Sequence, residues 1–300
     1  MALVLVLRSI LIFVVSILQF VSGDAIDFPL GISLGHHYLS SMYYNANNEL
    51  IHVATIDSSQ EWQDYFWATW TDPKEHAPVY DLDTLAMFIR IIKDIQSATE
   101  SVLNHSTEYR SLTAPAHFVK QPSMGTLMLA AYNSHFFASD QSYQVIPLPN
   151  AARLAYDLDT CKGLEQPQGC DVDDEDYFAL VFEYSQYYLH LTDPNSKTFL
   201  DLAIAIQNFM DEMIAYLLES NIETPESKVH GIILAGEASI QGMDELKPVI
   251  EKALPRYKNR FLFDIDPGLV GVIGAAHRAR QYVTEHGILN PREGMAHEEL

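Results

Sequence analysis

His36 and His37 are the first residues of this chain whose type and spacing could bind a metal ion, because each carries imidazole nitrogens. Adjacent residues of a strand point to opposite faces, so two neighbouring imidazoles rarely share one ion. The run from Asp171 to Asp176 is rich in carboxylates, but it lacks the spaced ligands and the glycine of an EF-hand. We expect a hydrogen-bonded or exposed turn at the histidines and a solvated acidic loop, with weak calcium association as the alternative for the loop.

Asp157 and Asp159 form a second pair of groups that could take part in catalysis, since paired carboxylates act as acid and base in some hydrolases. Both residues directly follow a helical segment, and we expect them only to end that helix. The chain has neither a P-loop nor a His-x-x-x-His zinc motif. These patterns therefore predict no metal site and no catalytic residue.

Cys161 and Cys170 are the only two cysteines, which excludes a disulfide scaffold and a zinc site built on several thiolates. They enclose the segment KGLEQPQG, whose glycines and prolines favour a tight loop. In an oxidising compartment we expect one disulfide that closes this loop, with two buried free thiols as the alternative. Asn104 begins the only glycosylation sequon, Asn-His-Ser, where a helix is expected to end.

The composition narrows the class of partner. Lys and Arg number 18 against 40 Asp and Glu, giving a formal net charge of -22. This balance argues against nucleic acid and against anionic membranes, because both are bound by clusters of Lys and Arg. With 48% hydrophobic residues the chain is expected to be globular and soluble once processed.

Both ends of the chain resemble targeting signals. Residues 1–23 contain one early charge, Arg8, then a long apolar run and small residues, as in a secretory signal peptide; an uncleaved signal anchor is the alternative. The last four residues are His297, Glu298, Glu299 and Leu300, which differ by one methylene from the H-D-E-L retention signal. We expect retention in the lumen of the endoplasmic reticulum, with secretion as the alternative.

Hydrophobic periodicity predicts two successive α/β units. Alternating strands and helices indicate parallel strands with helices on both faces, and a duplicated unit places its ligand cleft between the halves. An irregular aromatic stretch is expected over 62–70. The predicted strands are 29–34, 38–45, 49–56, 112–118 (ending at Pro115), 143–147, 178–183, 187–191, 229–235 and 261–263; the predicted helices are 81–103, 123–137, 150–156, 199–218, 243–254 and 269–282.

Five segments, in chain order, carry a family resemblance: PLGISLGHHYLSSMYYNANNELIHV, LTAPAHF, VIPLPNAARLAYDLDT, HGIILAGEASIQGMDELKPVIEKAL and DIDPGLVGVIGAAHRA. Together they resemble the actin-like ATPases, and most closely the nucleotide-binding domain of the 70-kDa heat-shock chaperones. The resemblance implies a duplicated ribonuclease-H-like fold with two subdomains around a nucleotide cleft. The implied division is a signal peptide at 1–23, subdomains at 24–158 and 177–285, an acidic connecting loop at 159–176 and a tail at 286–300.

The same resemblance implies where nucleotide would bind. Its phosphate-binding turns correspond to Gly35, His36 and His37 in the first half, and to Glu183 and Ser185 in the second. Its adenosine loop corresponds to Gly236 and Glu237.

These turns depart from the family pattern. Ser33 replaces an aspartate that organises magnesium, and Tyr187 and Tyr188 replace glycines that let backbone N–H groups approach phosphate. Glu237 replaces the second glycine of the adenosine loop, and no lysine lies between positions 31 and 71. The lobes that close over nucleotide in the chaperones are expected to be missing or vestigial.

We therefore expect a pseudoenzyme, with no cofactor, that acts through contacts with an unknown protein, either another lumenal chaperone or a client. The first alternative is a protein of the same fold that binds ATP with magnesium and hydrolyses it slowly, with Gly35, Glu183 and Gly236 as its main site residues. The second is a secreted enzyme of another class.

Overall fold

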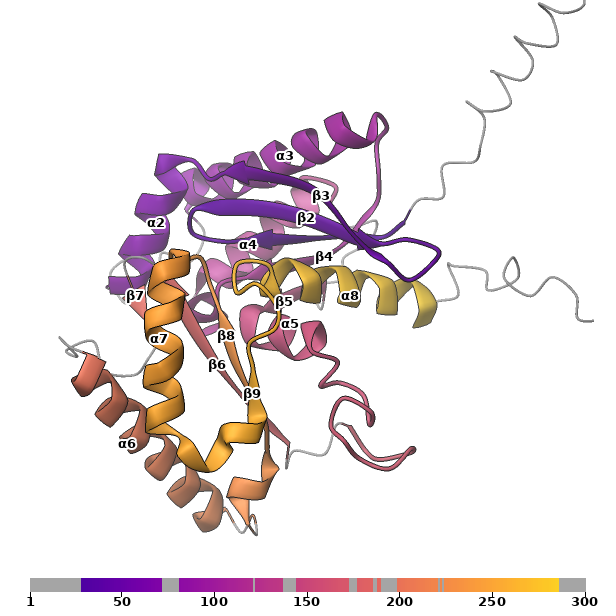
Figure 1. Ribbon diagram of the computed structural model, residues 1–300. Helices are drawn as coiled ribbons and strands as arrows, with labels where there is room; N and C mark the ends of the chain where they lie inside the picture. The colour runs from indigo at the N-terminus through magenta and orange to yellow at the C-terminus, as the bar shows by residue number, and fades with distance from the viewer. Residues whose placement is uncertain are drawn as a thin grey trace, which may run out of the picture.

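The structure is a computed structural model, and it describes residues 28–71, 81–120, 122–136, 144–172, 177–185, 188–189, 199–220, 222 and 224–285. Figure 1 shows two sheets with helices packed around them. The first half comprises β1 (Leu30–Leu34), β2 (Tyr38–Tyr44), β3 (Leu50–Asp57), α2 (Gln60–Thr71), α3 (Leu82–Leu103), β4 (Tyr109–Ala114), the 3₁₀ turn η1 (Ala116–Lys120), α4 (Pro122–Asn133), β5 (Val145–Pro147) and α5 (Leu148–Ala155). The second half comprises β6 (Phe178–Ser185), β7 (Tyr188–Leu189), α6 (Phe199–Glu219), η3 (Pro225–Lys228), β8 (Val229–Ala235), α7 (Ile240–Ala253), η4 (Pro255–Arg260), β9 (Phe261–Leu262) and α8 (Val270–Glu285).

The two sheets share a strand order. The first sheet runs β3-β2-β1-β4-β5; β1 pairs antiparallel with β2 and parallel with β4, and β4 pairs parallel with β5. The second sheet runs β7-β6-β8-β9, with β6 antiparallel to β7 and parallel to β8, and β8 parallel to β9. Without β3, the first sheet would have the order and the pairing directions of the second.

Side-chain alternation along β2 explains why helices cover both faces of the first sheet. Ser41 is fully buried and its hydroxyl lies 2.8 Å from the hydroxyl of Thr99 on α3. The next residue, Met42, packs in a cluster with Val272 and Ile273 of α8. Because successive side chains of a strand point to opposite faces, α3 and α8 must lie on opposite sides of this sheet.

Helix α3 has clear start and stop signals. Asp81 is its N-cap and accepts hydrogen bonds from the backbone N–H groups of Asp83 and Thr84. Asn104 ends the helix in the left-handed conformation, at φ 59°. The face turned toward the sheet is formed by the buried residues Met87, Phe88, Ile91, Ile92, Ile95 and Thr99.

Strand β8 alternates in the same way within the second sheet. Ile232 and Leu234 belong to the cluster that includes residues of α6 and α7. Ile233 and Ala235 face the other side, where they pack with Leu148 of α5 and its neighbours. The second sheet is therefore covered on one face by α6 and α7, and on the other by a helix from the first half of the chain.

The halves exchange their last helices. α5 packs on β6, whereas α8, the last described helix, packs on β1, β2, β4 and α5 (Figure 1). This crossing requires glycine at two points: a Cβ on Gly31 would lie 2.2 Å from the backbone carbon of Ala275, and a Cβ on Gly274 would lie 2.0 Å from the carbonyl oxygen of Ala151. Both distances are far inside van der Waals contact, so the backbones approach more closely than any side chain allows.

The expected α/β class is confirmed, since the structure combines a mixed sheet, a largely parallel sheet and packed helices. One expected element was wrong, and one expected strand has other bounds. The aromatic stretch at 62–70 is not irregular but forms helix α2, in which Trp62 and Phe66 are buried. The strand expected at 112–118 begins earlier, at Tyr109, and ends at Ala114, because Pro115 cannot donate to the ladder and the chain turns into η1.

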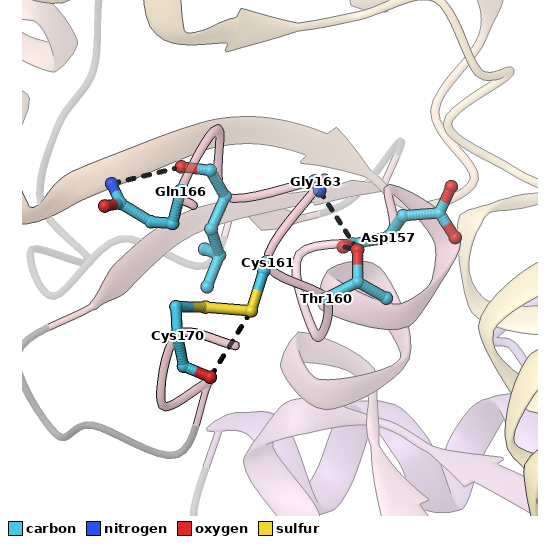
Figure 2. The surroundings of a disulfide bond; sticks show 7 residues. Asp157, Thr160, Cys161, Gly163, Gln166 and Cys170 are labelled. Carbon is cyan, nitrogen blue, oxygen red and sulfur yellow. Dashed lines mark hydrogen bonds between the residues drawn. A yellow bond between two sulfur atoms is a disulfide. The ribbon is translucent and has the colours of Figure 1, made fainter. Parts of the chain in front are cut away.

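The expected disulfide is confirmed. Cys161 and Cys170 are bonded, as Figure 2 shows. Their Cα atoms lie 5.7 Å apart. In the enclosed loop, the backbone N–H of Gly163 donates to the hydroxyl of Thr160 at 3.0 Å. Leu164 is 2% exposed and packs with Leu158 against the second sheet. The disulfide thus closes a loop that contributes to the core between the halves.

Several expectations fall on residues that the structure does not describe: the signal peptide at 1–23, the residues at 173–176 of the acidic run, Tyr187, and the tail with His297 to Leu300. Within the described part of the chain, no helix combines the length and apolarity needed to cross a bilayer.

Candidate functional site

A small cavity lies where the two halves meet, at the carboxyl ends of their central strands. The first half contributes the β1–β2 turn and the end of β4, and the second contributes the ends of β6 and β8. Ligands of α/β sheets bind at such strand ends. Five of the residues expected from the resemblance line this cavity: Gly35, His36, Glu183, Gly236 and Glu237.

The carboxylate of Glu237 occupies the β1–β2 turn. The backbone N–H of His37 donates to its Oε2 at 2.6 Å, and the N–H of Tyr38 donates to its Oε1 at 3.1 Å. Consecutive backbone N–H groups of this kind form an anion-binding concavity. Here the anion is a side chain from about 200 residues later in the sequence.

Gly35 makes room for this carboxylate. A Cβ on Gly35 would lie 1.8 Å from Oε1 of Glu237, so any other residue would displace the acid from the turn. The backbone N–H of Gly35 donates to the carbonyl of Tyr38 at 3.0 Å, which closes the hairpin. The absence of a side chain at Gly35 therefore admits Glu237 to the turn.

Gly236 fixes the position of the acid from the other side. It adopts φ 111°, a conformation that favours glycine, and a Cβ there would lie 2.2 Å from the carbonyl oxygen of Tyr184. That carbonyl accepts the N–H of Ala238 at 3.2 Å, and the N–H of Gly236 donates to Pro267 at 3.0 Å. The loop after β8 is thus held against both β6 and the segment before α8.

Glu237 is an unusually weak acid. Burial, together with the nearby charge of Glu183, raises its pKa to about 7, against the lowering effect of the N–H donors of His37, Tyr38 and His36. Glu183 is itself 5% exposed. Two carboxylates therefore face one small cavity, and near neutral pH a substantial share of the Glu237 side chains carries a proton.

The two histidines do not supply a compensating positive charge. Burial, then the charge of His37, lowers the pKa of His36 to about 4, and burial also lowers the pKa of His37. Their rings lie 4.2 Å apart, on the same side of the chain. Both residues lie in the turn between β1 and β2, as expected, so the alternation of side chains along a strand does not separate their rings.

The size of the cavity limits what it can hold. Its volume is about 40 Å³, which corresponds to roughly three water molecules. No lysine or arginine is among the described residues that line it. A triphosphate with magnesium is several times larger and strongly anionic, so it does not fit while Glu237 stays in the turn.

No protein-family model matches this chain, and a search of curated proteins gives no match. The site is therefore interpreted from its own geometry.

A larger cleft lies on the other side of Glu237. Its volume is about 520 Å³, within the usual range for small-ligand sites. Strands β2 and β3 form one wall, through Tyr38, Ser40 and Thr55. The other wall is formed by the first turns of α7 and by the segment 263–269 before α8.

The remaining expected residues lie apart from the cavity or lack described side chains. The side chain of Ser185 is not described, and neither is that of Tyr188. Asn104 is exposed at the end of α3, where a glycan would meet solvent.

Asp157 and Asp159 form the one group with potential metal ligands found in the described residues, together with His277. These side chains already hold the end of α5 against α8. His277 Nδ1 lies 2.8 Å from the carbonyl of Leu154, as expected for an N–H donor, and Asp159 accepts a hydrogen bond from Gln281. The expectation that the two aspartates end a helix agrees with these contacts.

One sequence pattern was overlooked. Gly31-Ile32-Ser33-Leu34-Gly35 matches G-x-S-x-G, the nucleophile elbow of the α/β-hydrolases. That motif requires a sharp turn from a strand into a helix, whereas here Ser33 lies inside β1 and pairs with Ser40 and Thr113 on the neighbouring strands. Ser33 therefore lacks the exposed position of a nucleophile.

Proposed function

We propose that this chain is a non-catalytic protein with the actin-like ATPase fold, related to the 70-kDa heat-shock chaperones, and that it acts in the secretory pathway through protein contacts. The fold part of the proposal is a duplicated ribonuclease-H-like unit. Its support is the shared strand order of the two sheets and the exchange of α5 and α8 across them.

The occupation of the β1–β2 turn by Glu237 carries the functional part of the proposal. A nucleotide could bind in the family's manner only if the Glu237 carboxylate left two backbone N–H donors and gave up a partly buried position. The cavity would also have to expand well beyond about 40 Å³ and accept more negative charge beside Glu183. The lost hydrogen bonds, the small volume and the added negative charge all disfavour nucleotide binding, so the site is closed to phosphate.

The alternative with weak nucleotide binding draws on a different observation. The cleft of about 520 Å³ beside Glu237 is large enough for a nucleoside, and Gly236 lines it. A nucleotide whose nucleoside part bound there would leave its phosphates outside the turn. Slow hydrolysis would then proceed without hydrogen-bond donors to the phosphates, and Glu183 would be the one carboxylate left to hold magnesium.

Thermal unfolding with millimolar Mg-ATP, Mg-ADP and phosphate tests the proposal. We expect no stabilisation of the wild-type protein at any concentration. A ligand at a hundred times its Kd would stabilise the fold by about 2.7 kcal/mol, which raises the melting temperature by several degrees. A dose-dependent rise of this size would contradict the proposal and favour the nucleotide-binding alternative.

Two variants sharpen this experiment. Glu237→Ala empties the turn, and we expect it to gain stabilisation by phosphate, because the N–H groups of His37 and Tyr38 become available to an external anion. Glu251→Ala, an exposed residue of α7, removes the same charge elsewhere and should gain none. Equal behaviour of both variants would show that Glu237 is not what closes the turn.

A further inference from the structure

The cleft beside Glu237 combines an apolar lining with uncompensated negative charge. Its apolar residues include Tyr38 and Ile240, which are 45% and 83% exposed although large. Exposed apolar side chains grouped at a cleft are characteristic of surfaces that bind a partner. Met243, Phe263 and Ile265 extend this apolar surface into the cleft.

The charged groups of the cleft are almost all acidic. Asp264 and Asp266 are exposed at its wall, and neither forms an ion pair within the described residues. Among the described residues that line it, the one cation is Lys247, which lies 3.7 Å from the carboxylate of Asp244 and is thereby largely offset. The cleft therefore presents two carboxylates that form no ion pair within the described residues, beside an apolar floor and in front of the weak acid Glu237. Asp266 Oδ1 accepts the backbone N–H of Gly268 at 2.9 Å, which leaves its negative charge uncompensated.

Charge complementarity selects the occupant. An anionic ligand such as a nucleotide is repelled by these carboxylates and by the net charge of -22, whereas a cation is attracted. A bare polyamine would leave the apolar surface exposed to water. A peptide segment with Lys or Arg between apolar residues satisfies both surfaces, because its cations face Asp264 and Asp266 while its apolar side chains cover Ile240 and Tyr38.

We propose that this cleft is the docking site for a basic, apolar-flanked peptide segment of a partner protein. The inference rests on the proposed function, in that the site is available to protein because it is not used for nucleotide. Asp264 and Asp266 contribute the attraction, and Tyr38 and Ile240 the apolar contacts.

Fluorescence anisotropy with a rhodamine-labelled peptide GLKLKLG tests the site, with GLELELG as the control. We expect saturable binding of the lysine peptide and none of the glutamate peptide. The double variant Asp264→Asn/Asp266→Asn should weaken binding about tenfold at low salt, because it removes the unpaired carboxylates. Ile240→Ser should weaken it several-fold without loss of stability, since this side chain is exposed.

The matched control is Asp94→Asn/Glu251→Gln, which removes two exposed charges outside the cleft. It should change the affinity less than about twofold. Equal weakening by both double variants would overturn the proposal, because the attraction would then come from the charge of the whole molecule. Displacement of the peptide by spermidine as effectively as by unlabelled peptide would also overturn it, since charge alone would suffice.

The outcomes separate this inference from the proposed function. If the correctly folded protein binds neither the lysine peptide nor Mg-ATP, the docking site is overturned and the proposed function stands. Displacement of the bound peptide by Mg-ATP would overturn the proposed function and leave the docking site intact.

Discussion

A turn that presents consecutive backbone N–H groups attracts an anion, and in this protein the carboxylate of Glu237 binds these N–H groups. Glu237 reaches the turn because Gly236 adopts a left-handed conformation and Gly35 has no side chain. Both glycines therefore serve to place the acid in the turn. One side chain thus occupies the N–H groups of the turn.

Glu237 should make the stability of the fold depend on pH. Its pKa is about 7 in the folded protein against 4.5 in the unfolded chain, so the folded state binds more protons between these values. Its contribution is fully present below pH 4.5 and is lost as the pH rises through 7. Relative to Glu237→Gln, the wild type should lose roughly 3 kcal/mol of unfolding free energy between pH 4.5 and 8.

Urea unfolding of both proteins at several pH values measures this difference. The comparison is needed because His36, whose pKa is lowered to about 4, has the opposite effect: its contribution is present above pH 6.5 and is lost as the pH falls. That effect is common to both proteins. Parallel stability curves for wild type and variant would show that Glu237 does not take up a proton in this range.

At the scale of elements, the sequence patterns predicted most strands and helices but missed α2. Trp62, Phe66 and Thr69 recur at helical spacing and are buried, and the side chain of Ser59 accepts the N–H of Trp62 as an N-cap does. The polar and exposed aromatic residues between them, such as Trp67, obscured this period. The cap at Ser59 was the available signal.

The contact between α5 and α8 depends on Gly274. Gly274→Ala would place a methyl group 2.0 Å from the carbonyl oxygen of Ala151, which forces the helices apart. We expect a loss of about 2–3 kcal/mol in unfolding free energy, measured by urea denaturation.

Gly125→Ala is the matched control, because Gly125 is exposed on α4 and a Cβ there meets nothing within 4 Å. It should stabilise the protein by about 0.5–1 kcal/mol, since alanine favours the helix. Equal effects of the two substitutions would mean that the close approach of α8 does not limit stability.

At the scale of the whole molecule, the residues of the site could be predicted, but their contacts could not. Gly35, Glu183, Gly236 and Glu237 were expected from the resemblance to the actin-like ATPases, and they lie around one cavity. The hydrogen bond from His37 to Glu237 spans 200 positions and exists only because the two sheets meet at their strand ends. The duplicated pattern predicts a cleft between the halves, but it does not predict which residues are in contact across that cleft. It also does not predict the exchange of α5 and α8.

This exchange predicts that neither half folds alone. α8 covers one face of the first sheet with Val272, Ile273, Tyr282 and Val283, each at most 9% exposed. At about 1.5–3 kcal/mol for each buried side chain, their loss equals most of the roughly 5–15 kcal/mol that stabilises a domain. Residues 28–172 expressed alone should therefore lack a cooperative urea transition and bind the dye ANS, and co-expression with residues 177–285 should restore the transition. A sharp transition of the first fragment alone would show that α8 is dispensable for its core.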